Sequence, residues 1–196
     1  AECQRQIGKL FTAQGAYDDA LNWITKANTQ FETLGNHTET SNTLLDLGII
    51  HWYQGDFDQA LTHYEACRTL AKAEADQLTY FRAVGNIGNV YYWQGQNAKA
   101  LECFEICHDI AIKQQDRLIL SRNFGNIGNV YVEQGDYTRA LKAYRENLRL
   151  AREIGYQQGV SITVGNIGNV YLERGACEAA LICSTYNSVS YTHLTL

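Results

Sequence analysis

Apolar and aromatic residues along much of this chain stand three and four positions apart. In one stretch they are Val84, Ile87 and Tyr91, and such residues hold the same three places 40 positions later. This spacing puts the side chains on one face of an α-helix, whereas a half-buried strand would alternate at every second position. No segment shows the alternation of a strand. The pattern therefore predicts an all-α protein.

The pattern repeats with a period of 40 residues. The segment Gly-Asn-Ile-Gly-Asn-Val-Tyr begins at Gly85, Gly125 and Gly165. Small residues keep a common phase in three columns: Gly8, Gly48, Gly88, Gly128 and Gly168; Gly15, Gly55, Gly95, Gly135 and Gly175; Ala20, Ala60, Ala100, Ala140 and Ala180. Repetition of this kind is the signature of a repeat architecture. We predict five repeats, at residues 1–40, 41–80, 81–120, 121–160 and, in truncated form, 161–183.

Each repeat is predicted to contain two antiparallel helices. Gln-Gly pairs such as Gln54-Gly55 should end the first helix, because glycine accepts the left-handed conformation found at helix ends. Asp56 and Asp136 are placed to cap the second helix. We expect the second helices to begin near Tyr17, Phe57, Asn97 and Tyr137. One hairpin cannot bury its apolar stripe alone, so the hairpins should stack into an α-solenoid.

These columns resemble the tetratricopeptide repeat family in its 40-residue variety. The family's aliphatic-Gly-x-x-Tyr motif is matched by Ile-Gly-Asn-Val-Tyr at residues 87–91, and its later positions by Gly95, Ala100 and Phe104. The resemblance covers residues 1 to about 183. It implies helix hairpins wound into a right-handed superhelix, and a role in binding other proteins.

The two ends of the chain raise a separate question. The chain contains no methionine, and we interpret it as a fragment of a larger tetratricopeptide repeat protein. Residues 184–196 depart from the repeat, because they are rich in hydroxyl and β-branched side chains with poor helix propensity. They also resemble translated adapter or vector sequence. We treat them as an atypical tail of native or non-native origin and leave them out of the functional argument.

Each first helix carries a second face, opposite its buried stripe, that is rich in asparagine. We predict that stacking lines these faces along a concave, peptide-binding groove, with the candidate residues Arg82, Asn86, Asn89, Tyr92, Arg122, Asn126, Asn129, Asn166 and Asn169. Asparagine both donates and accepts hydrogen bonds, so it can pair with the backbone of an extended ligand. Arginine favours a carboxylate. The family resemblance implies the same role for the asparagines and arginines of the third and fourth repeats. We therefore expect a protein or peptide partner, with an acidic one favoured.

Alternatives stay open for these residues and for the whole chain. The asparagines could instead solvate the groove or bond between neighbouring helices, and the glycines at 85, 125 and 165 could serve helix packing. Trp52, Tyr92 and Trp93 carry the same ambiguity. The chain as a whole could be a structural or self-associating segment of a larger signalling protein. The match to the chaperone-tail clamp of the same superfamily is poor, so we do not predict chaperone binding.

The charge balance narrows the choice of partner. The chain has 21 acidic and 16 basic side chains, a net charge of −5, and so lacks the basic excess that binds nucleic acid or anionic membranes. It contains no apolar run long enough to span a membrane. The six cysteines lie within helical segments rather than at loop-closing spacings, which is typical of a reducing compartment. We expect a cytoplasmic protein.

Catalysis and cofactors find little support in the sequence. There is no H-E-x-x-H, G-x-S-x-G or G-x-x-x-x-G-K-[ST] motif, and we predict a non-enzyme without a cofactor. One metal alternative exists, because His63, Cys67, Cys103 and Cys107 hold equivalent places on two second helices. Four ligands must converge within about 2.0–2.3 Å of one zinc ion, while helix axes lie about 8–10 Å apart. We therefore predict no metal site.

Overall fold

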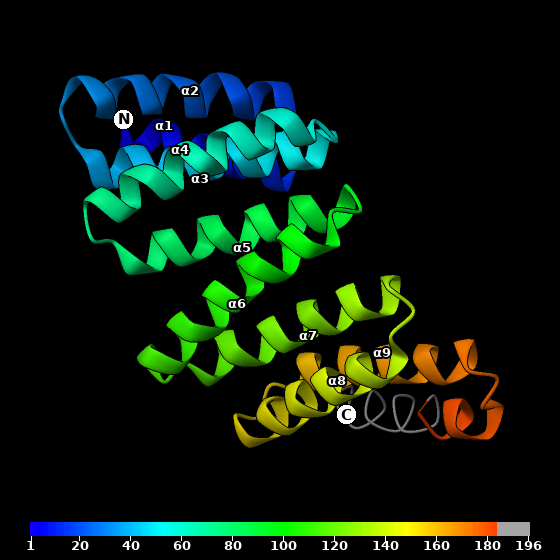
Figure 1. Cartoon of the computed structure of the whole chain (residues 1–196). Helices are drawn as coiled ribbons and strands as arrows, with labels where there is room; N and C mark the ends of the chain where they lie inside the picture. Colours follow the sequence, from blue (N-terminus) through cyan, green and yellow to red (C-terminus); the bar gives the residue numbers. More distant parts are fainter. Residues whose placement is uncertain (184–196) are drawn as a thin grey trace. The chain divides into compact units, whose positions relative to one another are not determined.

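The structure is a computed structural model that describes residues 1–183. These residues form α-helices joined by short turns, and they contain no strand (Figure 1). The helices are α1 (Glu2–Ala13), α2 (Tyr17–Thr33), α3 (His37–Gln54), α4 (Phe57–Ala73), α5 (Gln77–Trp93), α6 (Asn97–Gln114), α7 (Arg117–Glu133), α8 (Tyr137–Glu153) and α9 (Gln157–Glu173). Residues 177–183 are also helical. The all-α prediction is confirmed. The predicted tail, residues 184–196, lies outside the described residues.

The helices follow the 40-residue period of the sequence. The second helices α2, α4, α6 and α8 begin at Tyr17, Phe57, Asn97 and Tyr137, as predicted. Successive helices from α1 to α5, and again from α6 to α9, pack against each other as antiparallel hairpins, so the fold is an α-solenoid. The chain divides into two compact units, the N-terminal unit Ala1–Gln96 and the C-terminal unit Asn97–Leu196.

Each unit has its own layer of first helices. In the N-terminal unit, α3 contacts both α1 and α5 directly, in addition to the second helices beside it. In the C-terminal unit, α7 contacts α9 in the same way. The first helices therefore share a face within each unit, and that face holds the residues predicted to bind a ligand.

Helix ends are formed by left-handed residues and by short polar caps. Gly55 ends α3 with φ of 78°, and the side chain of Asp56 then accepts a hydrogen bond of 3.1 Å from the backbone N–H of Gln59. Asp136 accepts one of 2.9 Å from Arg139 N–H, so both predicted caps are confirmed. Three further caps were not predicted from the sequence: Asn36 for α3, Asp76 for α5 and Asp116 for α7.

Two links between repeats hold a non-glycine residue in the left-handed conformation. Ala75 has φ of 54° and Gln115 has φ of 55°, whereas the equivalent positions in other repeats are Gly35 and Gly155. This conformation costs a residue with a Cβ about 1–2 kcal/mol. Ala75 and Gln115 are therefore points of local backbone strain.

Replacing Ala75 or Gln115 by glycine should raise the free energy of unfolding by about 0.5–1 kcal/mol each, because the relief of strain exceeds the entropy that glycine loses on folding. Urea denaturation measures the change. Gly35→Ala is the matched control and should shift stability the other way, since its Cβ would meet nothing within 4 Å and only the backbone is strained. A loss of stability in both glycine variants would contradict the assigned backbone conformations.

Small residues on the first helices make room for side chains of the second helices. A Cβ at Gly48 would overlap the ring of Tyr64, and one at Gly128 would overlap the ring of Tyr144. Both rings are almost fully buried, at 2% exposure. The small residues thus let helices approach within ring contact, as expected from their strict columns.

Candidate functional site

The first helices of the N-terminal unit line a cavity of about 670 Å³. It is formed by α1, α3 and α5 with the turn between α1 and α2. Its lining residues are Lys9, Thr12, Ala13, Gln14, Gly15, Tyr17, Asp46, Ile49, Tyr53 and Arg82. Of the predicted groove residues only Arg82 is among them. Sequence reasoning therefore missed most of this cavity.

An ion-pair network between α1 and α3 neutralises the acidic group of the cavity. Arg5 Nε donates to Asp46 Oδ2 at 2.7 Å, and Arg5 Nη1 donates to Glu39 Oε2 at 2.9 Å. The side chains of Arg5 and Asp46 are only 11% and 8% exposed. Burial alone would lower the pKa of Arg5, but the charge and hydrogen bond of Asp46 and the charge of Glu39 raise it above its ordinary value. Asp46 therefore contributes little net negative charge to the cavity.

Two cations on the cavity wall remain available to a ligand. Lys9 of α1 and Arg82 of α5 are exposed, and neither forms an ion pair within 4 Å among residues 1–183. A carboxylate bound at this wall would meet two positive charges, while Asp46 is neutralised by Arg5 and Asp76 acts on Arg82 only through its charge, without an ion pair. The cavity is thus suited to an anionic group.

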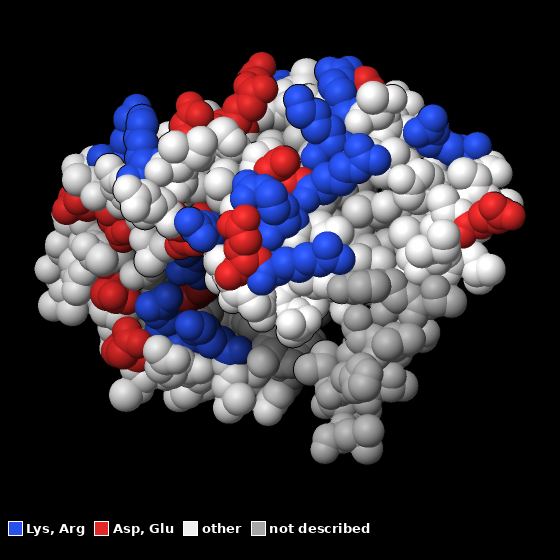
Figure 2. Space-filling view, turned by 90° about the horizontal axis from the view of Figure 1, so that it is seen from below, with Lys and Arg blue, Asp and Glu red and all other residues white. Residues whose placement is uncertain are grey.

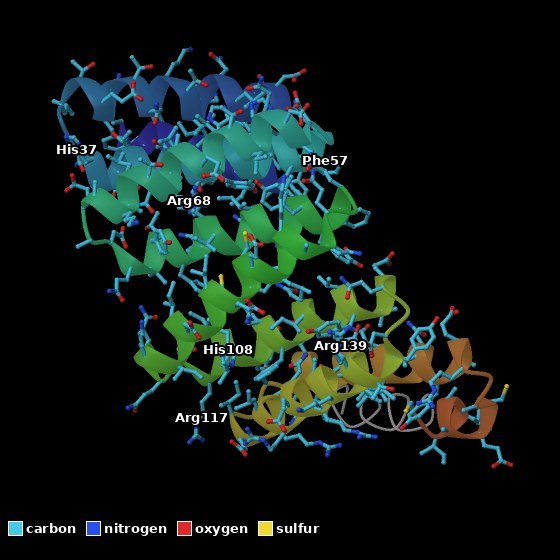
Figure 3. The ribbon with its side chains drawn as sticks, viewed as in Figure 1. His37, Phe57, Arg68, His108, Arg117 and Arg139 are labelled. Atoms are coloured by element: carbon cyan, nitrogen blue, oxygen red, sulfur yellow. The ribbon has the colours of Figure 1, made fainter. Side chains whose placement is uncertain are left out.

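Two tyrosines line the cavity, and a separate aromatic cluster is formed by α3, α4 and α5. Tyr53, 58% exposed, stacks on Tyr17 with ring centroids 5.8 Å apart. In the second cluster the ring of Trp93, which is 65% exposed, lies 6.2 Å from that of Trp52 and 6.2 Å from that of Tyr92. Trp52 also contacts Phe57, which Figure 3 labels at the start of α4. The predicted residue Tyr92 belongs to this aromatic cluster and does not line the cavity.

The two asparagines of α5 carry amides that are open to a ligand. Asn86 and Asn89 are half-buried on the first-helix layer of the N-terminal unit. Neither amide hydrogen-bonds to another residue in the described part of the chain. Their polar atoms therefore lack an internal role, which is the condition for pairing with a ligand backbone.

The predicted residues of the C-terminal unit divide into bonded and open side chains. Asn129 Oδ1 accepts a hydrogen bond of 2.6 Å from the Tyr144 hydroxyl and a long one of 3.5 Å from Asn166 Nδ2. The guanidinium of Arg122 lies 5.4 Å from the ring centre of Tyr156. Asn129 therefore links α7 to α8 and α9, which is the alternative role considered for the asparagines.

Asn126 and Asn169, in contrast, form no hydrogen bond within residues 1–183. Asn126 is half-buried on α7 and Asn169 is exposed on α9. The structure thus brings Asn129 and Asn166 together and leaves Asn126 and Asn169 open to solvent. These two amides are the better candidates for a ligand contact in the C-terminal unit.

Two other asparagines, which were not predicted as site residues, are buried and form hydrogen bonds between helices. Asn147, 7% exposed, accepts a hydrogen bond of 2.6 Å from the Ser121 hydroxyl. Asn123, 4% exposed, donates one of 2.7 Å to the carbonyl of Phe104. A Cβ at Gly125 would lie 2.8 Å from Asn147 Nδ2, so that glycine serves helix packing.

The described residues offer no arrangement for metal chemistry. No group of three or more His, Cys, Asp or Glu side chains in residues 1–183 is placed to hold a metal ion. Burial raises the pKa of the Cys67 thiol to about 12, although the positive charge of Arg82 acts in the opposite direction. Burial, with Cys103 nearby, likewise raises the pKa of Cys107 to about 12. Both thiols stay protonated near neutral pH and behave as core side chains.

None of the helices within residues 1–183 has the length and hydrophobicity that a membrane span requires.

Comparison with known proteins identifies the repeats. A family model described as tetratricopeptide repeat matches residues 1–73, 79–153 and 117–184, and a second model with the same description matches residues 45–105. No curated protein matches the chain in sequence.

Several solved structures share the fold. BtubC (BKLC) from P. vanneervenii superposes with a TM-score of 0.85 at 15% identity, over 96% of this chain and 78% of that one. Aspartyl phosphate phosphatase F from Bacillus subtilis gives 0.89 at 13%, over 98% of this chain and 50% of that one. A Rap protein complexed with competence and sporulation factor gives 0.83 at 14%, over 96% and 53%. At these identities the likeness shows the fold alone, and this chain spans about half of the last two proteins.

Proposed function

The chain belongs to the tetratricopeptide repeat family, and we propose that it is a non-catalytic interaction module that binds a peptide segment of a partner protein. The binding surface is the exposed face of the first helices. The family is generally non-catalytic, and its fold serves protein–protein interaction. The peptide and its place in the groove are our inference for this chain.

The cavity between α1, α3 and α5 carries this proposal. Lys9 and Arg82 would hold an acidic side chain or a C-terminal carboxylate, while Ile49 and Tyr53 would cover an apolar neighbour of that group. A peptide with acidic and apolar residues in succession satisfies both walls. A Rap protein of the same fold has been solved in complex with competence and sporulation factor, which supports a binding role for this fold.

The open amides extend the proposed contact beyond the cavity. Asn86 and Asn89 would pair with the backbone of a peptide held by the N-terminal unit, without reading its side chains. In the C-terminal unit, taken by itself, Asn126 and Asn169 would offer the same kind of contact. Arg122 would favour an acidic residue in the C-terminal unit. Asn129 and Asn166 would act mainly by ordering the first-helix layer, because they already bond to each other.

A peptide selected from a random displayed library against the whole chain provides the test. The double variant Lys9→Ala, Arg82→Ala should weaken its binding at least about tenfold, because two charge-assisted contacts are lost. Fluorescence anisotropy with the labelled peptide measures the affinity. Lys26→Ala with Lys72→Ala, on the second helices α2 and α4, is the matched control and should leave affinity unchanged. Equal affinities for all three proteins would refute binding in the cavity.

A further inference from the structure

We propose that the C-terminal unit carries a self-association surface, in which α6 and α8 of one copy pair with α8 and α6 of a second copy. The two helices carry opposite charges at equivalent positions of the 40-residue repeat. On α6 these positions are Glu102, Glu105 and Asp109, and on α8 they are Lys142, Arg145 and Arg149. All six side chains are exposed.

Helix geometry places each set in a row. Steps of three and four residues share one helix face, so each triplet forms a charged stripe on the solvent side of its helix. The opposite faces are buried, as Phe104 and Cys107 show for α6 and Tyr144 and Ala151 for α8. In Figure 2, Lys and Arg side chains gather across the face seen from below, and Asp and Glu side chains lie among them.

The charge reversal is particular to this pair of helices. The same three positions hold Asn22, Thr25 and Thr29 in α2, and Thr62, Glu65 and Thr69 in α4. A general need for solubility would not reverse the sign between neighbouring second helices while leaving the first two nearly neutral. The reversal therefore indicates complementarity between two surfaces.

The stripes are only partly neutralised within the molecule. Glu102, Glu105, Lys142 and Arg145 form no ion pair within 4 Å among the residues that the structure describes, and no ion pair there joins α6 to α8. Arg149 is paired only with acidic residues of its own helix. Like charges three and four residues apart repel one another, so an opposing stripe would relieve each row.

Two-fold symmetry allows both stripes to be satisfied at once. In an isologous dimer the contact of α6 with α8 of the second copy is repeated as α8 with α6, so every ion pair occurs twice. Equivalent repeat positions lie at the same height along their helices, and a two-fold axis along the helices would set Lys142 opposite Glu102. Ile112, 52% exposed, occupies the register of Arg152, whose aliphatic stem would cover it. A second copy is complementary to both the acidic stripe of α6 and the basic stripe of α8, whereas an unrelated acidic partner is complementary only to the stripe of α8.

Sedimentation velocity with the full chain tests the dimer by charge reversal. The wild type should dimerise in about 50 mM salt and dissociate in about 500 mM, because exposed ion pairs are screened. Lys142→Glu with Arg145→Glu, or Glu102→Lys with Glu105→Lys, should each weaken the dimer at least about tenfold. Mixing the two double variants should restore a mixed dimer, and the fourfold variant should dimerise alone.

Control variants separate this surface from the peptide site and from other partners. Asn22→Glu with Thr25→Glu, at the equivalent positions of α2, should leave the dimer unchanged, as should Lys9→Ala with Arg82→Ala. A wild type that stays monomeric in low salt would overturn the proposal. Mixed double variants that fail to pair would also overturn it. So would a dimer that is weakened by the α8 variant but not by the α6 variant, because α8 would then face an acidic surface other than α6.

Discussion

Arg5→Met should lower the free energy of unfolding by about 3 kcal/mol, because it leaves Asp46 charged and buried without its partner. Arg5 holds Asp46 and Glu39 across the contact between α1 and α3, and the Asp46 side chain is only 8% exposed. The remaining carboxylate would have neither solvent nor a cation to stabilise it. Denaturant unfolding monitored by circular dichroism measures the loss.

Two further variants separate the lost ion pair from lost packing. Arg5→Met with Asp46→Leu should recover most of the stability, since replacing both partners by apolar side chains removes the unpaired charge. Arg149→Met is the matched control on an exposed pair, with Arg149 53% exposed, and should cost less than about 0.5 kcal/mol. Equal losses in Arg5→Met and Arg149→Met would show that the network does not stabilise the N-terminal unit.

Gly128→Leu should destabilise the chain by about 1–3 kcal/mol, because the new side chain overpacks the contact between α7 and α8. A Cβ at this position already overlaps the ring of Tyr144, which is buried and donates its hydroxyl to Asn129. The ring would have to move, and the hydrogen bond to Asn129 would be lost with it. Thermal melting reports the change.

A double-mutant cycle identifies the cause of that loss. In a Tyr144→Ala background the ring is absent, so Gly128→Leu should cost clearly less than in the wild type. The same cost in both backgrounds would mean that Gly128 is required for a reason other than the ring. It would also weaken the explanation of why this column holds only small residues.

The fold could be predicted from the sequence because its determinants repeat. Gly55 and Ala60 recur in every copy, in phase with helix ends and packing contacts, and the cap Asp56 recurs as Asp136, so the copies support one another's assignment. The strained links at Ala75 and Gln115 were not foreseen, since neither residue favours the left-handed conformation that the repeat imposes there.

The site could be predicted only in part, for the opposite physical reason. The cavity is lined at positions where the repeats differ, such as Lys9 and Ile49, which share one register with Asn89 and Asn129. Recurring residues in the sequence identify the asparagines, but they do not identify the cavity, because its lining residues do not recur. Whether an amide is open also depends on its neighbour across the hairpin, as Asn129 is bonded by the hydroxyl of Tyr144.

The location of the bound peptide is the central claim, and amide-resolved NMR titration tests it most directly. With the library-selected peptide added to the labelled full chain, the largest shift changes should occur at Lys9, Tyr53 and Arg82, together with the side-chain amides of Asn86 and Asn89. Largest changes on the second helices α2 and α4, with these residues unmoved, would contradict binding on the first-helix face.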